Sequence, residues 1–355
     1  MTKDELEKTI VGGEIISKRD FAGQDLSSAQ LGGAIFEAVN FRDANLTDCS
    51  FRESVLVDCD FTGANLSGSD LKHTTLTKCN FSGANLTSAV LIQTAIMETN
   101  FANASLAGAD LTVAALAHCN LSATRLTGAN LDRTAIVDSA TDGIDLSHTH
   151  LQQTTLLKAD LSQANLQGIS AEMAIFIEAN LTGQDLSGLT LIKCQFTTAL
   201  LAGSNFSDAT ITQCNFMAAD LTGAQFDKAD AERSMFSTAK MQGARLRNAK
   251  LTQSLFAEAD LTKADLSESH MLQCNFMRSV CCKAKFSNAE LTYADFSHSD
   301  LSQCDFSGAT LYRTVLHQVK GEQATFTDRR SALETDEELA EAENWFIKQT
   351  GKGNS

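Results

Sequence analysis

The stretch FSGANLTSA, residues 81–89, contains the unit that decides the fold of this chain. Phe81 and Leu86 are apolar and stand five positions apart, each is followed by Ser or Thr, and a small residue, Ala84, precedes Leu86 by two places. The same order returns in ADLTGAQF, residues 219–226. A spacing of five fits neither a 3.6-residue helix nor a long strand that alternates every two residues. It fits a short strand followed by a corner, with the apolar residue and the small residue facing inward.

This five-residue unit recurs over most of the chain. From Phe21 to Leu316, with few exceptions, every fifth residue is apolar, which gives 60 consecutive units without an insertion. We call the apolar residue the centre of its unit. Nineteen of the 20 Phe residues occupy this phase, Phe326 included, and only Phe346 does not. The chain has no Pro, a residue that removes a ladder hydrogen bond, so the composition suits strands that are nearly all central.

The spacing of the Phe residues indicates how many units make one coil. Among the 60 centres, Phe pairs separated by 5, 10, 15 and 20 residues number 1, 9, 2 and 12. With 20 residues in each coil, residues of the same type lie over one another in successive coils. We therefore expect stacked Phe ladders from Phe21 to Phe101 and from Phe176 to Phe296. The 60 units then make about 15 four-sided coils. We name the sides after their first centres: the Phe21, Leu26, Leu31 and Phe36 sides.

The pattern A-[DN]-[LF]-[ST]-X over residues 16–326 resembles that of the pentapeptide-repeat family. The resemblance implies an all-β fold, a right-handed quadrilateral β-helix with four pentapeptides in each coil. The expected organisation is an N-terminal cap with a short helix at residues 1–15, the continuous β-helix at 16–326, and a C-terminal helix and tail at 327–355.

Short helices are expected at both ends, because the terminal coils of a solenoid need caps. Thr2 and Glu5 have the spacing of a capping box in a helix over residues 2–9. Ser331 and Glu334 have the same spacing at the start of a helix predicted over residues 331–348. This second helix carries Leu339, Trp345 and Phe346, which either cover the last coil or form a dimer or partner contact, as at this end of some family members.

The Cys and His residues do not form a catalytic or metal-binding motif in the sequence. Eight of the 10 Cys residues occupy the small inward position, where Cys fills space: Cys49, Cys59, Cys79, Cys119, Cys194, Cys214, Cys274 and Cys304. Cys281 replaces a centre, and Cys282 is the one candidate for a reactive thiol. The seven His residues (His73, His118, His148, His150, His270, His298 and His317) are expected to be scattered over several sides without clustering. We therefore predict no enzyme, and no site for a metal, a cofactor or a small-molecule substrate.

The outward residues that flank the centres differ between the four sides. Val, Ile, Leu and Met number 2, 0, 4 and 13 among the 30 flanking positions of the Phe21, Leu26, Leu31 and Phe36 sides. The thirteen on the Phe36 side, here called the apolar row, are Ile35, Val55, Val57, Met97, Val137, Leu157, Ile175, Ile177, Met217, Met235, Leu255, Met277 and Val315. Monomers rarely expose such a patch, so we expect the row to bind a protein partner or a second copy of the chain. Two alternatives stay open: shielding by long corner side chains, and coverage by the chain's own C-terminal helix.

The Phe21 side predicts a negative surface. Its flanking positions carry 7 acidic and 2 basic residues, and its acidic row comprises Asp20, Asp60, Asp160, Asp220, Asp260 and Asp300. The whole chain has a formal net charge of −16, which disfavours direct binding to nucleic acid or to an anionic membrane. No apolar run approaches the ~18 residues of a membrane helix.

Two functions compete, beside a third, an effector or enzyme accessory delivered into another cell, for or against which the residues give no indication. The first is a rigid, non-catalytic interaction scaffold or adaptor, and the stretch IISKRDFAGQDLSSAQLGGAIF, residues 15–36, resembles pentapeptide-repeat proteins associated with type VI secretion. The second is DNA mimicry, because some family members resemble a B-form duplex, bind DNA gyrase and confer fluoroquinolone resistance. The charged N-terminus lacks the apolar core of a signal peptide. We therefore expect a cytoplasmic bacterial protein, with signal-independent secretion as the alternative.

Overall fold

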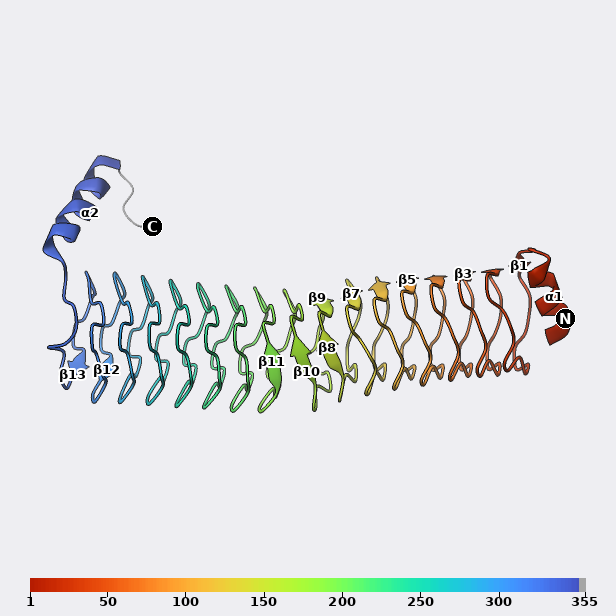
Figure 1. Ribbon diagram of the computed structural model, residues 1–355, viewed down its shortest axis with the longest axis horizontal. Helices are drawn as coiled ribbons and strands as arrows, with labels where there is room; N and C mark the ends of the chain where they lie inside the picture. The colour runs from red at the N-terminus through yellow and green to blue at the C-terminus, as the bar shows by residue number, and fades with distance from the viewer. Residues whose placement is uncertain (351–355) are drawn as a thin grey trace. The chain divides into compact units, whose positions relative to one another are not determined.

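The computed structural model describes residues 1–350 and separates into two compact units. The N-terminal unit comprises Met1–Gln184 and Leu189–Gln195, and the C-terminal unit comprises Asp185–Gly188 and the chain from Phe196 onward. Each unit is a parallel β-solenoid, as the repeat predicts (Figure 1). The last five residues of the predicted tail, 351–355, lie outside the described residues. The three-part organisation of the chain stays a prediction.

The N-terminal unit begins with a helix and carries two parallel sheets. Helix α1 spans Lys3–Val11. The first sheet follows the Phe36 side and contains β1 (Ile16–Ser17), β2 (Ile35–Glu37), β3 (Val55–Val57), β4 (Thr75–Thr77), β5 (Ala95–Met97), β6 (Ala115–Ala117), β7 (Ala135–Val137) and β9 (Thr155–Leu157), in that order. The second sheet follows the Leu31 side and contains β8 (His150–Gln152), β10 (Ser170–Glu172) and β11 (Thr190–Ile192). Successive coils therefore contribute one short strand each to the same side (Figure 1).

The C-terminal unit contains the remaining named elements, β12 (Asp305–Phe306), β13 (Thr325–Phe326) and helix α2 (Glu337–Thr350). Its other coils pair through single parallel bridges, such as Met235 with Leu255. These bridges use the same backbone hydrogen bonds as the strands but extend over one residue at a time.

The register confirms the four-sided coil. Every pair of neighbouring strands joins residues that are twenty apart, as Ile35 joins Val55. The other three sides have the same register, shown by the bridges Asp20 with Asn40, Asp25 with Asn45, and Gln30 with Ser50. Residues twenty apart in the sequence therefore lie over one another in neighbouring coils of a unit.

Nearly all corners are turns whose third residue has a positive φ. In the unit that starts at Leu26, Ser28 has a φ of 60° and the Ala29 N–H donates to the Leu26 carbonyl at 3.0 Å. A positive φ at this position is the pattern of a type II turn. The corner therefore suits Gly, Asn and Asp, and it strains β-branched residues such as Val113, which has a φ of 59°.

The core is a set of stacked rings and small inward residues. In the N-terminal unit the rings of Phe21, Phe41, Phe61, Phe81 and Phe101 are stacked, with consecutive centroids 4.5–5.4 Å apart. In the C-terminal unit the stack runs from Phe196 to Phe296 with centroids 4.5–5.0 Å apart. Many inward hydroxyls donate to the coil before, as when Thr74 Oγ1 donates to the Phe51 carbonyl at 2.9 Å. Others donate within their own coil, as when Ser204 Oγ donates to the Leu201 carbonyl at 2.7 Å. Among residues 1–350, no buried side-chain nitrogen or oxygen lacks a partner.

The two helices differ in how well the capping boxes predict them. The box of Thr2 and Glu5 forms, and α1 continues two residues beyond the predicted end at Thr9. The box of Ser331 and Glu334 does not form, and the prediction of a helix from Ser331 is wrong.

Helix α2 begins at Glu337, because the segment before it keeps pairing with the last coil. The Leu333 N–H donates to the Thr314 carbonyl at 2.8 Å, and the Leu333 carbonyl accepts from the Leu316 N–H at 2.7 Å. Asp336 then caps the helix, since its Oδ1 accepts from the Leu339 N–H at 3.0 Å.

Candidate functional site: the outer faces of the solenoid

All thirteen residues of the apolar row lie outside the core. Six expose 36–49% of their surface: Ile35, Val55, Met97, Met217, Met235 and Leu255. The other seven are half-buried: Val57, Val137, Leu157, Ile175, Ile177, Met277 and Val315. The first eight along the chain belong to the N-terminal unit and the last five to the C-terminal unit.

In the N-terminal unit six of the eight row residues lie on strands of the eight-stranded sheet, and Ile175 and Ile177 follow in the next coil beyond β9. The strand register arranges its outward residues in two columns, one continuing from Val55 and one from Val57. Between β3 and β9 these columns hold twelve residues, here called the uncharged face: Val55, Val57, Thr75, Thr77, Ala95, Met97, Ala115, Ala117, Ala135, Val137, Thr155 and Leu157. None of the twelve side chains is charged, and the four Ala side chains in the middle of the face are short.

Charged side chains border the uncharged face without covering it. Lys78 Nζ lies 4.0 Å from Glu98 Oε2 in the neighbouring coil, and both side chains are about half exposed. Met97, directly before Glu98, still exposes 49% of its surface. The long side chains at the corners therefore do not shield the apolar surface from solvent.

Helix α2 lies beside the C-terminal end of the apolar row. In the C-terminal unit, Met277 and Val315 line a groove of about 670 Å³ together with Leu333 and, from α2, Leu339. The polar residues Asp295, Asp336, His298, His317 and Glu343 line the same groove. The first turns of α2 therefore lie beside the last coils of the Phe36 side.

The three residues singled out on α2 are largely exposed. Trp345, Phe346 and Leu339 expose 63%, 58% and 48% of their surfaces, whereas Ala340 is buried. Ala342, Phe346 and Ile347 line a second hollow together with Arg278. A cap or dimer role for Leu339, Trp345 and Phe346 stays a prediction.

The acidic row of the Phe21 side takes part in ladders of hydrogen bonds. Asn40 Nδ2 donates to Asp20 Oδ1 at 2.9 Å, and Asn180 Nδ2 donates to Asp160 Oδ1 at 3.1 Å. The hydroxyl and backbone N–H of Ser162 lower the pKa of Asp160. For Asp60 burial raises the pKa, but hydrogen bonds from Thr62 and Arg42 outweigh it, and the pKa is lowered. These two carboxylates are therefore ionised at neutral pH.

The same balance lowers the pKa of Asp300, where hydrogen bonds from Ser302 outweigh burial. Asp220 and Asp260 each accept a hydrogen bond from the backbone N–H two residues later. The six acidic residues thus follow one outer side in each unit, interrupted in the C-terminal unit by Lys240 and Val280.

The cysteines are structural, with one half-exposed exception. Nine are buried free thiols, and Cys282 is the half-buried one. Burial raises the pKa of Cys274 to about 12. Burial and the Asp300 carboxylate also raise the pKa of Cys282, so this thiol is protonated at neutral pH and is a weak nucleophile.

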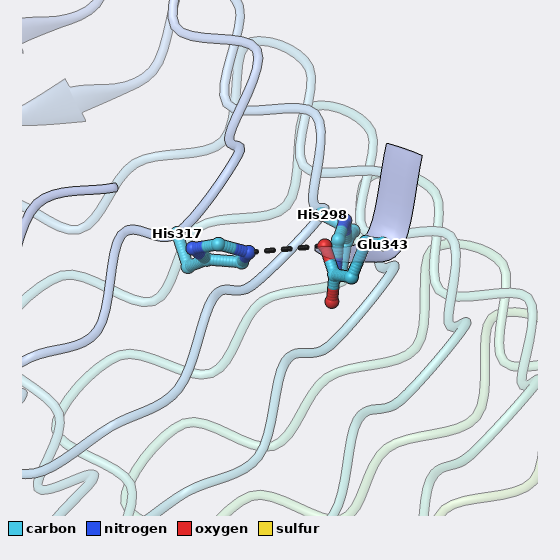
Figure 2. A group of neighbouring side chains, drawn as sticks. All are labelled: His298, His317 and Glu343. Atoms are coloured by element: carbon cyan, nitrogen blue, oxygen red, sulfur yellow. Dashed lines mark hydrogen bonds and ion pairs between the residues drawn. The ribbon is translucent and has the colours of Figure 1, made fainter. Parts of the chain in front are cut away.

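The expectation that the His residues do not cluster is wrong. His298, His317 and Glu343 each offer one ligand atom, and these atoms lie within 4.8 Å of one another (Figure 2). His298 stands two places after Phe296, and His317 stands one place after Leu316. These two centres occupy neighbouring coils of the Phe36 side, so both His residues lie at the same corner. Grouping the residues by the corner on which they lie, rather than by a spacing of twenty, would have revealed His298 and His317 as neighbours. The repeat gives no indication of Glu343.

Two family models match most of the repeat. The model described as pentapeptide repeats (8 copies) matches residues 25–133 and 142–216 in overlapping segments, and residues 283–318. The model described as a pentapeptide repeat region matches residues 209–286. The chain belongs to the pentapeptide-repeat family. The fold inferred from the five-residue spacing is therefore the fold of its family.

Solved structures of other pentapeptide-repeat proteins resemble this family member. HetL, involved in heterocyst differentiation regulation in the cyanobacterium Nostoc, is 24% identical with a TM-score of 0.24, over 67% of this chain and 91% of HetL. A protein of the Arabidopsis thaliana thylakoid lumen is 29% identical with a TM-score of 0.25, over 32% of this chain and 71% of its own. QnrB1, a plasmid-mediated fluoroquinolone resistance protein, is 16% identical with a TM-score of 0.19, over 72% and 92%.

The comparison with curated proteins returned no match. Neither helix within residues 1–350 has the length and hydropathy of a membrane span.

Proposed function

We propose that this pentapeptide-repeat chain is an interaction scaffold that binds a protein partner through the uncharged face of its N-terminal unit. The observation that supports the proposal is the composition of that face: twelve outward positions on six neighbouring strands without one charge. A solvated sheet face ordinarily carries polar residues. The Leu26 side of the same coils does so, with Asn, Ser, Thr, Arg and Asp at its outward positions.

The uncharged face has the properties of an interface core. Val55 and Met97 are exposed over 36% and 49% of their surfaces, and Met adapts its shape to different contacts. Each strand is hydrogen-bonded to the coil before it and the coil after it, so little backbone order has to be gained on binding. The charged corner residues, among them Lys78 and Glu98, form a polar border. An apolar centre with a polar border is the usual anatomy of a protein interface.

A paired substitution tests this face. Met97→Asp with Val137→Asp places two charges in one column of the sheet, on β5 and β7. The matched control is Ser67→Asp with Ala107→Asp on the Leu26 side. Both control residues also follow a centre directly and are also forty residues apart. Neither pair touches the core, so both variants should fold.

The measurement is crosslinking mass spectrometry on native cells, followed by affinity measurement with the purified partner and by the oligomeric state in solution. We expect the partner, or the second copy, to crosslink next to the uncharged face, and its affinity to fall at least tenfold with the Met97/Val137 pair alone. Unchanged affinity and unchanged oligomeric state in that variant would refute the proposal.

A second candidate function, DNA mimicry toward gyrase, is favoured by the acidic row. Asp60 and Asp160 in the N-terminal unit and Asp300 in the C-terminal unit have lowered pKa values, and each presents an ionised carboxylate on the Phe21 side of its unit. A gyrase supercoiling assay with added protein tests this candidate. Protection of gyrase that is lost when Asp160 and its neighbours are changed to Asn supports it, and no effect at micromolar protein removes it.

Association with a type VI secretion system is a narrower form of the scaffold proposal, and it is supported only by the resemblance of residues 15–36. The crosslinking experiment separates it from other scaffolds, because the partners identified would then be components of that system.

A further inference from the structure

The corner that follows the Phe36 side brings two imidazoles and a carboxylate together at the end of the C-terminal unit. His298 and His317 come from neighbouring coils, and Glu343 comes from the middle of α2. His317 Nε2 lies 3.1 Å from Glu343 Oε2, and His298 Nε2 lies 3.3 Å from Glu343 Oε1 (Figure 2). The two imidazole rings are nearly perpendicular, with centroids 5.3 Å apart.

The cluster is sheltered but reachable from solvent. The side chains of His317, His298 and Glu343 are exposed over 4%, 16% and 31% of their surfaces. All three line the groove between α2 and the last coils. An ion could enter through this groove, and a water molecule or an outside ligand could occupy a remaining coordination position.

We propose that His298, His317 and Glu343 form a binding site for a first-row transition-metal dication of the zinc type. Zinc binds His nitrogen and carboxylate oxygen at about 2.0–2.2 Å, so its ligand atoms in a tetrahedral site lie about 3.3 Å apart. The nitrogen–oxygen distances, 3.1 Å to Glu343 Oε2 and 3.3 Å to Glu343 Oε1, are close to that spacing. The three ligand atoms lie within 4.8 Å of one another, so they draw closer together when an ion binds. Two imidazoles with one carboxylate leave the fourth position open. Imidazole ligands favour Zn²⁺, Ni²⁺ or Cu²⁺ over Mg²⁺ and Ca²⁺.

A neighbouring side chain supports the carboxylate. Gln318 Nε2 donates to Glu343 Oε2 at 2.9 Å, which orients the carboxylate toward the imidazoles. Such outer partners of metal ligands typically change affinity 10–100-fold when they are removed. Gln318 is therefore a positioning residue of the proposed site.

One contact has to change when the ion binds. His317 Nδ1 accepts a hydrogen bond from the Asp336 backbone N–H at 3.2 Å, so in the ion-free protein the neutral ring carries its proton on Nε2. Coordination through Nε2 moves that proton to Nδ1, which can then no longer accept from Asp336. The first turn of α2 has to release this contact, while Glu343 holds the middle of the helix to the coils.

The same three groups can also hold α2 by hydrogen bonds alone, and metal titration of the full chain separates the two roles. We expect one equivalent of Zn²⁺ by calorimetry and a Co²⁺ visible spectrum typical of nitrogen and oxygen ligands. Mg²⁺ should give no signal. His317→Ala and Glu343→Gln should each weaken Zn²⁺ binding at least 100-fold, and Gln318→Ala about tenfold.

His270→Ala is the matched control. His270 Nδ1 also faces a carboxylate, Glu290 Oε2, at 3.2 Å, but both side chains are about half exposed or more and belong to no cluster of three ligands within residues 1–350. This variant should bind Zn²⁺ like the unchanged protein. Far-UV circular dichroism and the melting temperature report whether each variant folds. If His317→Ala unfolds, the Zn²⁺ affinity of Glu343→Gln, a change on helix α2, tests the proposal instead.

Hydrogen exchange measures an effect of Zn²⁺ that would not occur if the three groups only held α2 by hydrogen bonds. With Zn²⁺, the amide of Asp336 should exchange faster, and the amides of residues 340–346 should exchange more slowly. No Zn²⁺ binding at micromolar concentration would overturn the proposal. Equal binding by the unchanged protein, His317→Ala and Glu343→Gln would also overturn it.

Discussion

The rings of Phe216 and Phe236 stack in neighbouring coils, with centroids 5.0 Å apart and planes inclined by 2°. Both side chains are completely buried. They stand twenty residues apart, so the contact links the period of the sequence to the period of the coil. The outer residues that precede them follow the same register, as Asn215 pairs with Met235. Outward residues that are spaced twenty apart in the sequence therefore form a continuous strip on the surface of the unit.

The Phe stack should dominate the local stability of the C-terminal unit. Phe236→Ala removes a buried ring that stacks on Phe216 and Phe256, and we expect a loss of about 3–5 kcal/mol in the free energy of unfolding. Met217→Ala, next to Phe216 but on the outer face, should cost less than about 1 kcal/mol. Urea unfolding followed by circular dichroism measures both. Equal losses in the two variants would contradict the inward and outward assignment.

A strained corner offers a stabilising substitution. Val113 is a β-branched residue with a φ of 59°, a conformation that costs an L-residue about 1–2 kcal/mol. Val113→Gly should relieve this strain and raise the free energy of unfolding by about 0.5–1 kcal/mol. Thr112→Gly, at the preceding position, has no positive φ to relieve and also loses the hydrogen bonds of the Thr112 hydroxyl with Asp110 and Asn130, so it should lower the free energy of unfolding by at least about 0.5–1 kcal/mol. Thermal unfolding of the two variants checks the sign, and destabilisation by Val113→Gly would count against the turn geometry.

Acid should weaken the solenoid through Asp265, the one buried Asp among residues 1–350. Burial raises the pKa of Asp265, but hydrogen bonds from Ser267 and Arg247 outweigh it, so the folded pKa lies below the unfolded value of 3.8. A depressed folded pKa adds stability above the unfolded pKa, and that stability is lost as the pH falls through the folded pKa. The free energy of unfolding should therefore fall below about pH 4.

Asp265→Asn isolates this contribution. It removes the ionisable group but keeps the shape, so the variant should be about 1–2 kcal/mol less stable at pH 7. Its stability should also depend less on pH between 5 and 3 than that of the unchanged protein. Denaturant titrations at several pH values provide the comparison, and parallel pH profiles for the two proteins would be the contrary result.

Thiol labelling tests the burial of the cysteines. Nine of them are enclosed in the coils, and only Cys282 is half-buried. Under native conditions a thiol reagent should label Cys282 alone, and slowly, because burial and Asp300 raise its pKa. Cys282→Ser should abolish native labelling without changing the fold. Rapid labelling of a second cysteine would show that a coil opens.

The sequence predicts the repeat well because one geometric rule governs it. Once the centres are known, the register, the inward cysteines and the outward position of Ile177 or Met217 follow from the alternation of a strand and the length of a coil. The Phe stacks could be predicted for the same reason.

The parts that lie outside the repeat could not be predicted in this way. A local capping box predicted a helix start at Ser331, but pairing of Leu333 with the last coil delays it to Glu337. His298 and His317 differ by nineteen residues because they occupy different positions of one corner. Glu343 joins them only through the docking of α2, a tertiary contact that no local pattern encodes.

The distance between spin labels on the uncharged face tests the coil most directly. With Val57→Cys and Leu157→Cys labelled in a Cys282→Ser background, the two labels stand one hundred residues apart in a single column. Five coils at about 4.8 Å per strand predict a narrow distribution near 24 Å. A fifteen-residue coil would give about 32 Å on a different side, and that distance, or a broad distribution, would contradict the account.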